Sequence, residues 1–451
     1  MNKIIPKKIL LNQIVYKIIC LLLIIGTMVL FINIDFMPSR DVCLTLVLGF
    51  MLLAAYCIGF LLEKIGLPRI TGYIFTGLFL GPYFLNLYSS NTVTKLGFLN
   101  NLALAFIAFC AGGELRLKNI RRIFKSIVYM ISGVTIVVFV GITLIVFSLS
   151  NFIPFMSSMS FPVKLAIASI FGVIAAARSP SSAIAIINET KAQGPYTDLV
   201  LSVSIAMDVV IIIAFAAVIS LCRVFIKAGG SINPKFFLFL LFEIAIAFIL
   251  GFLLGKFIVF LLDKLKVEFS IVIIAVGFLV IKFSHYLSDY LNEIQDISLK
   301  LEPLLICMAA GFSIQNFSDH GEKFLWRMNR ISLPIYIAFF VITGASININ
   351  ILKNAWFLGI IIVIARAIFL YIGSFLSGKL TIKEPKIYKN VWMGFITQAG
   401  VSLGLLAEVV RQFPEIGKPI QTILIASITL NQLIGPVAFK WGLKKVGETR
   451  T

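Results

Sequence analysis

Residues 161–188, FPVKLAIASIFGVIAAARSPSSAIAIIN, form a run that is long and apolar enough to cross a membrane, but its centre does not suit a helix. Residues 175–182 place Pro180 and three serines there. Proline removes one helix hydrogen bond and disfavours helical geometry at Ser179, the residue before it. Unwound backbone at membrane depth is tolerated where it lines a cavity or is buried in protein. The sequence therefore favours a transmembrane helix that is interrupted near its middle.

A second apolar run, residues 388–412, has a similar interruption. Its segment GFITQAGVS, residues 394–402, combines two glycines with three polar side chains. Two interrupted helices in separate halves of a chain are the expected sign of an inverted-repeat transporter, whose half-helix ends point at the ion. A simple proline kink could explain the first interruption alone, and glycine-mediated packing the second. Both together favour the transporter.

The whole chain has the composition of a membrane protein. Of its 451 residues, 60% are hydrophobic and 13% charged, and the mean hydropathy is +1.03. We predict one all-α membrane domain of about fourteen transmembrane helices, with no soluble regulatory module. The predicted spans are residues 13–34, 42–62, 68–87, 96–115, 123–149, 161–188, 197–225, 236–262, 267–288, 299–317, 326–347, 354–378, 388–412 and 419–442. The first run is too long for a signal peptide, so we interpret it as a retained helix.

The formal net charge of +19 is better explained by the membrane than by nucleic acid. The basic residues concentrate at the termini and in alternate loops, whereas the opposing loop 285–298 is acidic. The two most basic loops contain Arg116, Lys118, Arg121, Arg122 and Lys125, and Lys379, Lys383, Lys386 and Lys389. The positive-inside rule then places both termini in the cytoplasm, and we expect a bacterial-type inner membrane. The six cysteines have no metal-like spacing and are interpreted as small hydrophobes.

Asp208 is the acidic residue expected deepest in the membrane, near the middle of the run 197–225. Placing an ionisable side chain at that depth costs roughly several kcal/mol, so such a residue is a functional candidate by default. Ser204 lies four residues earlier, so both side chains share one helix face and can point at one cavity. A carboxylate there can hold either a proton or a metal cation, but not both. The alternative is a structural aspartate bonded to neighbouring hydroxyls.

Arg366 is expected near the middle of the run 354–378. An arginine is effectively always protonated, so it needs an acceptor there. That acceptor is either Asp208 or a set of helix-end carbonyls near the site. A fixed structural bridge is the simpler interpretation.

Several motifs of the sequence, taken together, resemble those of a known family. The segment GLPRITGYIFTGLFLGP, residues 66–82, resembles an early signature of the Kef-like, sodium/proton exchanger type of monovalent cation/proton antiporter. Residues 112–115, GGEL, with their basic loop, resemble the next motif. The Ser179–Pro180 pair, the Asp208 helix, Arg366 and residues 397–400, TQAG, follow in the family's order. The resemblance covers roughly residues 42–445, between an extra N-terminal helix in residues 1–41 and a short cytoplasmic tail, residues 446–451.

The resemblance implies a homodimer in which each protomer has a dimerisation domain and a core domain with two crossing discontinuous helices. Asp208 matches the ion-binding aspartate, and Arg366 matches a basic position on the third-last helix. The expected ion-binding residues are Asp208, Ser204, Ser179, Thr397 and Gln398. Arg366, Arg178, Pro180 and Gly400 are expected to compensate charge or shape the breaks. No cofactor and no resident metal are expected.

Three departures from the family pattern matter. Met207 replaces a carboxylate or amide that commonly precedes the ion-binding aspartate, so the partner of Arg366 is open. Arg178 lies unusually close to the first crossing and could repel a cation or offset a helix end. Ala399 and Val401 replace charged residues of many relatives. A single carboxylate suggests one-for-one, electroneutral exchange.

We therefore expect a secondary-active Na⁺ or K⁺/proton antiporter of the elevator type rather than an enzyme. A channel-like or sensor descendant of the fold, and a transporter of a lipid-linked glycan, are the alternatives. A membrane-embedded enzyme such as an acyltransferase is disfavoured, because neither His285 nor His320 lies beside a buried carboxylate or nucleophile at a recognisable spacing.

Overall fold

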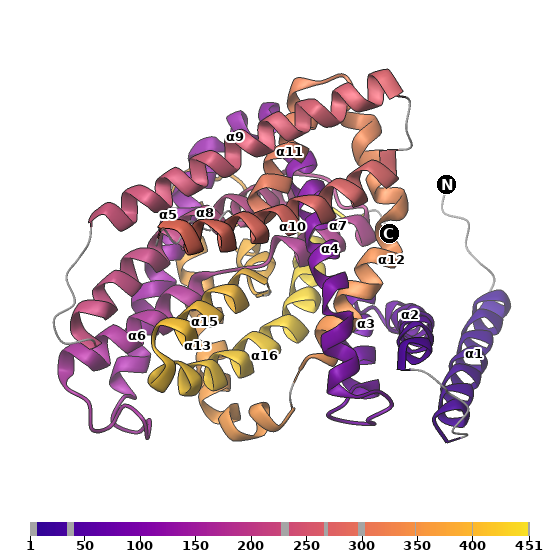
Figure 1. Cartoon of the computed structure of the whole chain (residues 1–451), viewed down its shortest axis with the longest axis horizontal. Coiled ribbons are helices and arrows are strands. Elements are labelled where there is room, and N and C mark those ends of the chain that lie inside the picture. The colour runs from indigo at the N-terminus through magenta and orange to yellow at the C-terminus, as the bar shows by residue number, and fades with distance from the viewer. Residues whose placement is uncertain are drawn as a thin grey trace. The chain divides into compact units, whose positions relative to one another are not determined.

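The computed structural model describes residues 7–33, 40–226, 234–265, 269–295, 303–347, 349–398 and 400–449, which form helices and their connections (Figure 1). The helices are α1 (Lys7–Asn33), α2 (Arg40–Lys64), α3 (Arg69–Leu80), α4 (Ser90–Glu114), α5 (Leu117–Ser148), α6 (Phe161–Ala176), α7 (Pro180–Thr190), α8 (Pro195–Ile226), α9 (Pro234–Leu265), α10 (Phe269–Gln295), α11 (Pro303–Phe317), α12 (Gly321–Ala345), α13 (Ile349–Thr381), α14 (Pro385–Tyr388), the 3₁₀ helix η1 (Val391–Phe395), α15 (Gly400–Gln412) and α16 (Pro414–Val446). The predicted all-α class is confirmed.

Nine of the described helical segments are long and apolar enough to cross a membrane. Four shorter apolar segments, at Ile14–Thr27, Val272–Ser284, Pro303–Phe317 and Val401–Val410, accompany them in the described part of the chain. The predicted number of fourteen crossings stays a prediction. Parts of residues 1–41 and of the acidic loop 285–298 lie outside the described residues.

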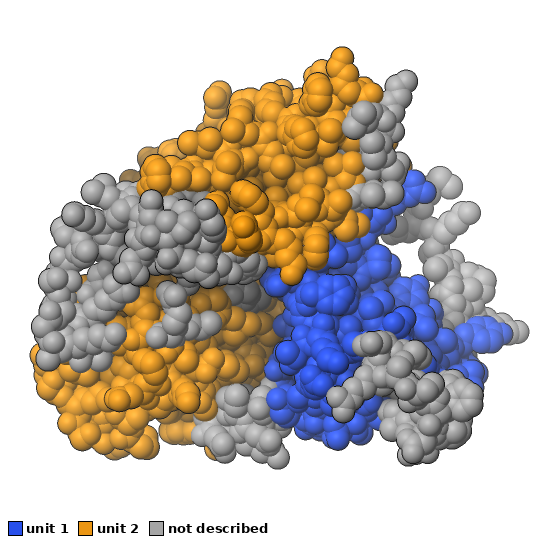
Figure 2. Space-filling view, viewed as in Figure 1, with its two compact units in different colours: residues 1–104, 329–349 blue, residues 105–328, 350–451 orange. Residues whose placement is uncertain are grey.

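The chain divides into two compact units (Figure 2). Unit 1 consists of residues 1–104 and 329–349, and unit 2 of residues 105–328 and 350–451. Each contains sequence from both halves of the chain, because the chain re-enters unit 1 at Asn329, within α12, and leaves it again after Ile349.

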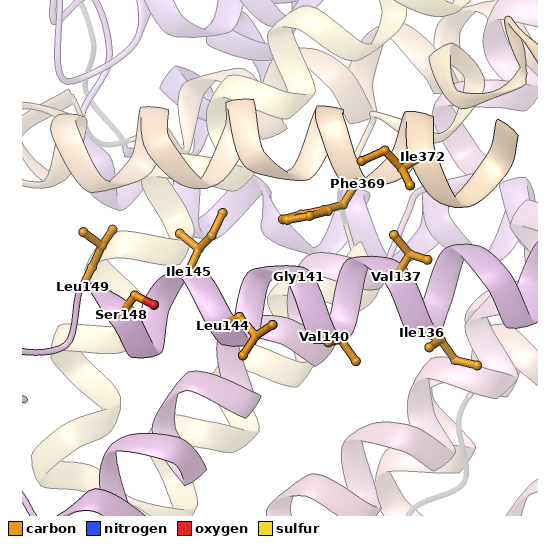
Figure 3. Close-up of a pocket in the computed structure, with 10 residues that line it drawn as sticks. All are labelled: Ile136, Val137, Val140, Gly141, Leu144, Ile145, Ser148, Leu149, Phe369 and Ile372. Carbon is orange, nitrogen blue, oxygen red and sulfur yellow. The ribbon is translucent and has the colours of Figure 1, made fainter. Parts of the chain in front are cut away.

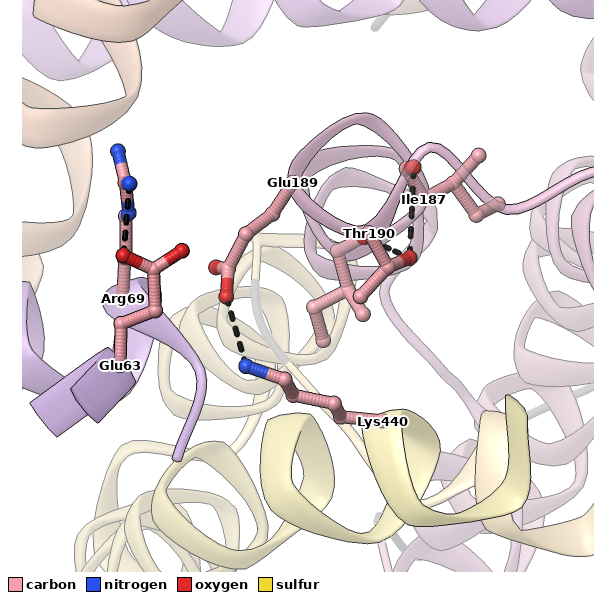
Figure 4. Close-up of polar contacts among 7 residues, drawn as sticks. Glu63, Arg69, Ile187, Glu189, Thr190 and Lys440 are labelled. Atoms are coloured by element: carbon pink, nitrogen blue, oxygen red, sulfur yellow. Dashed lines mark hydrogen bonds and ion pairs between the residues drawn. The ribbon is translucent and has the colours of Figure 1, made fainter. Parts of the chain in front are cut away.

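In unit 1, glycines of the segment 66–82 allow close helix packing. A β-carbon at Gly77 of α3 would collide with the backbone carbonyl of Val341 in α12. A β-carbon at Gly344 of α12 would likewise collide with the backbone carbonyl of Ile74. Small residues at such contacts let helix backbones approach within the membrane. The turn before α3 is closed by a 2.7 Å ion pair between Arg69 and Glu63 (Figure 4).

In unit 2, both predicted interruptions are present. α6 ends at Ala176 and α7 begins at Pro180, which occupies the first helical turn, where its missing N–H costs nothing. The second interruption differs in its first half, because a five-residue 3₁₀ helix, η1, replaces the expected longer helix. Gly394 of η1 packs directly against Val200 of α8, where a β-carbon would not fit. α15 then begins at Gly400.

An apolar groove of about 630 Å³ lies between α5 and α13 (Figure 3). Val137 and Gly141 of α5 line one side, and Phe369 and Ile372 of α13 line the other. Among its described lining residues, only Ser148 has a polar side chain. The groove therefore does not suit an ion, and the candidate site must be sought at the interruptions.

Candidate functional site

The two interruptions are joined by a backbone hydrogen bond. The N–H of Ser179 donates to the carbonyl of Thr397 over 2.9 Å. Ser179 has extended geometry, with φ −112° and ψ 109°, as expected for a residue before proline. Residues 177–179 and 396–398 thus meet where neither belongs to a helix. This hydrogen bond brings together Ser179 and Thr397, two of the predicted cation ligands, and both residues are buried.

Arg366 of α13 holds the ends of both broken helices. Its guanidinium is fully buried and donates four hydrogen bonds of 2.5–3.0 Å, all to backbone carbonyls. Two of the acceptors, Ala175 and Ala177, are at the end of α6, and the other two, Phe395 and Ile396, are at the end of η1. Helix C-termini carry unpaired carbonyls and partial negative charge, which an arginine satisfies. The hydrogen-bond acceptors of Arg366 are therefore helix-end carbonyls, one of the two predicted alternatives.

A pair of buried amides adds a second link. The side-chain amide of Gln398 donates to the carbonyl of Ile174 in α6 over 2.9 Å. Its oxygen accepts a 2.8 Å hydrogen bond from the amide of Asn431 in α16. Asn431 was missed from the sequence, although two neighbouring amides, at 431 and 432, within an apolar span were a usable signal. Gln398 therefore fixes the second break to α6 and α16.

Arg178 is the second buried cation of the site. Only 1% of its surface is exposed, and its guanidinium carbon lies 4.0 Å from the centre of the Phe395 ring. Within the described part of the chain, its three side-chain nitrogens have no hydrogen-bond partner. Its guanidinium interacts electrostatically with Asp208. Stacking on an aromatic face stabilises a desolvated arginine, so Phe395, which the sequence analysis missed, holds Arg178 in place.

Asp208 and Ser204 lie on the same face of α8 as Val200, the residue that contacts η1. Val200, Ser204 and Asp208 follow one another at four-residue spacing, and Val200 packs against Gly394. Ser204 is buried and Asp208 is half-buried. The sulfur of Met207 accepts a 3.2 Å hydrogen bond from the hydroxyl of Thr135 in α5. Met207 therefore contacts α5.

The described residues contain no group of three or more His, Cys, Asp or Glu side chains that could hold a metal ion. The site consists of one half-buried carboxylate, two buried guanidinium groups, hydroxyls and amides around two crossing breaks. Two crossing breaks with buried charges around them are the arrangement expected of an inverted-repeat, ion-coupled secondary transporter.

Comparison with known proteins identifies the family. Residues 48–445 match the model of the family described as sodium/hydrogen exchanger, transmembrane, and the chain belongs to that family. It is a multi-pass integral membrane protein, and its family supports cation/proton antiport rather than enzymatic activity.

Two solved structures of the sodium proton antiporter MjNhaP1 from Methanocaldococcus jannaschii share the fold. The structure at pH 8 has a TM-score of 0.62 and 18% identity, with 91% of this chain and 96% of that chain covered. The electron-microscopy structure has a TM-score of 0.71 and 17% identity, with 92% of this chain and 100% of that chain covered. No curated protein sequence matches the chain.

The hydrogen bonds of Arg366 predict the effect of its loss. Arg366→Gln leaves several buried carbonyls unpaired, so the variant should lose about 3–5 kcal/mol of stability. The melting temperature of the purified protein in detergent measures this loss. Lys379→Gln, an exposed change in the last turn of the same helix, is the control and should leave the melting temperature unchanged. A melting temperature of Arg366→Gln equal to that of the wild type would contradict the assigned role.

Proposed function

We propose that the protein exchanges a monovalent cation, Na⁺ or K⁺, for a proton by alternating access. The observation that carries this proposal is the half-buried carboxylate of Asp208, on the α8 face adjoining the second break and within the electrostatic reach of Arg178. One carboxylate holds either a proton or a cation, so the two compete. A charged carboxylate is costly to move across the membrane interior, and its neutralisation by one ion or the other therefore couples their movement.

The hydrogen bonds at the crossing narrow the set of cation ligands. The carbonyls of residues 175, 177, 395 and 396 already accept from Arg366. The side-chain oxygen of Gln398 already accepts from Asn431. We therefore assign the cation to the Asp208 carboxylate and the Ser204 hydroxyl, with Ser179 and Thr397 as the candidates contributed by the breaks. Gln398 becomes a structural residue in this proposal.

The same proposal includes an elevator movement of a core domain, a homodimer, a bacterial-type inner membrane and cytoplasmic termini. The basic loops around residues 116–125 and 379–389 support the cytoplasmic termini, and the crossing breaks support alternating access. The elevator movement and the homodimer are what the resemblance to the exchanger family implies.

Replacing the carboxylate tests the proposal. Asp208→Asn cannot release a proton or neutralise a cation, so it should abolish cation-dependent proton movement in inverted membrane vesicles, followed with a pH-sensitive dye. Asp319→Asn, an exposed change in the turn between α11 and α12, should retain full exchange. Exchange by Asp208→Asn at the wild-type rate would rule out this mechanism.

A single carboxylate predicts one-for-one exchange. In proteoliposomes, a membrane potential imposed with a permeant anion should then leave the initial exchange rate unchanged, because no net charge crosses the membrane. Initial rates of proton movement at several imposed potentials measure the dependence. A steep change of rate with potential would show that the stoichiometry is not one-for-one.

The positive charge of Arg178 should oppose cation binding at Asp208. Arg178→Gln removes that charge and should lower the apparent KM for the cation roughly tenfold at alkaline pH, equivalent to about 1.4 kcal/mol. Arg178→Lys retains the charge and should keep a KM near that of the wild type.

An unchanged KM in Arg178→Gln would remove Arg178 from the ion site. If the wild type also exchanged no cation, a channel-like or sensor descendant of the fold, or transport of another substrate, would become the better interpretation.

A further inference from the structure

The last described residues of the chain reach back to the helix that carries Asp208. We infer that Glu448 is a positioning residue, whose carboxylate anchors the first turn of α8 to the end of α16. One carboxylate oxygen accepts the backbone N–H of Tyr196 over 2.8 Å. The other accepts the backbone N–H of Thr197 over 2.8 Å and its hydroxyl over 2.7 Å.

These contacts complete the hydrogen bonding of the N-terminus of α8. A helix leaves its first N–H groups without partners in the helix. Pro195 has no N–H, and the N–H of Asp198 already donates to the carbonyl of Gly194 over 2.9 Å. Tyr196 and Thr197 thus carry the two remaining donors, and Glu448 accepts from both. A carboxylate at a helix N-terminus is also favoured by the partial positive charge there.

The local backbone on both sides is shaped for this contact. Gly447, with φ +85°, ends α16 in left-handed geometry, and its N–H donates to the carbonyl of Leu443 over 3.0 Å. The turn directs Glu448 back along the molecule, and its own N–H donates to the same carbonyl over 3.1 Å. On the α8 side, a β-carbon at Gly194 would collide with the carboxyl group of Glu448. Gly447 therefore provides the left-handed turn, and Gly194 leaves room for the Glu448 carboxyl group.

The same end of α16 also contacts α7, and it packs against Tyr196, which is bonded to the residue just before η1. Lys440 forms a 3.1 Å ion pair with Glu189 of α7, and the two side chains are only 10% and 9% exposed (Figure 4). The hydroxyl of Tyr196 donates to the carbonyl of Asn390, just before η1, over 3.1 Å. Its ring stacks on Phe439 of α16 with centroids 6.1 Å apart. The end of α16 therefore connects α7, α8 and the start of η1.

This arrangement gives Glu448 an indirect role at the ion site. Val200, Ser204 and Asp208 follow the anchored turn at about one, two and three helical turns. An anchor at Tyr196 and Thr197 fixes the rotation and axial position of α8, and with them the distance of the carboxylate from the breaks. The effect on transport rests on the proposed function, whereas the effect on α8 itself does not.

Glu448→Gln tests the anchor, because an amide NH₂ cannot accept the hydrogen bond that a carboxylate oxygen accepts. Hydrogen exchange of the Tyr196 and Thr197 amides in the purified full-length protein should accelerate roughly tenfold, as expected for a lost helix cap. In proteoliposomes, the apparent KM for Na⁺ or K⁺ should rise about threefold or more at an unchanged maximal rate, because fewer molecules hold α8 in the binding position.

Two further variants make the test specific. Gly194→Ala displaces the Glu448 carboxyl group and should reproduce both effects. Glu415→Gln, an exposed change in the first turn of the same helix α16, should produce neither. Unchanged exchange at Tyr196 and Thr197 in Glu448→Gln would overturn the anchor even if the wild type transported no cation. Faster exchange with an unchanged KM would overturn its role at the ion site.

Discussion

The structure of unit 2 depends on one guanidinium group. Two helices that end within a membrane leave backbone carbonyls to which no water can donate a hydrogen bond. Each such unpaired group costs roughly several kcal/mol. Arg366 is bonded to four of these carbonyls, from both breaks, through a side chain with five N–H donors. The C-terminal ends of α6 and η1 also carry partial negative charge, which compensates the buried arginine. Each feature makes the other tolerable, because the breaks need a donor and the arginine needs acceptors.

This interaction determines which groups remain for an ion. The four carbonyls and the charge of Arg366 satisfy each other, and the amide of Gln398 is bonded to Ile174 and Asn431. In the proposed mechanism, the groups that act on a cation are the Asp208 carboxylate, nearby hydroxyls and the opposing charge of Arg178, which Phe395 holds in place. The positive charge of Arg178 lowers the cost of a charged Asp208 carboxylate at this depth and also opposes a bound cation.

Much of this arrangement could be predicted from the sequence, because proline, glycine and isolated charges in apolar runs have few explanations. Pro180 and the glycines at 394 and 400 located both breaks. Asp208 and Arg366 were singled out by their expected depth, and the ion-binding role of Asp208 stays a prediction. The acceptors of Arg366 could only be stated as alternatives, since backbone carbonyls have no sequence signature. Phe395 and Glu448 were missed because their contacts join segments far apart in the chain, 252 residues in the case of Glu448 and Tyr196. The contact between Gly394 of η1 and Val200 of α8 also joins distant segments, which local sequence does not encode.

In the proposed mechanism one carboxylate, Asp208, binds either a proton or a cation. Proton release on cation binding tests it most directly. Na⁺ and K⁺ are each added to the purified protein in weakly buffered detergent solution at a pH where Asp208 is protonated, and the released protons are counted. We expect about one proton per protomer for the transported cation, and none from Asp208→Asn. Saturable cation binding without proton release in the wild type would contradict it.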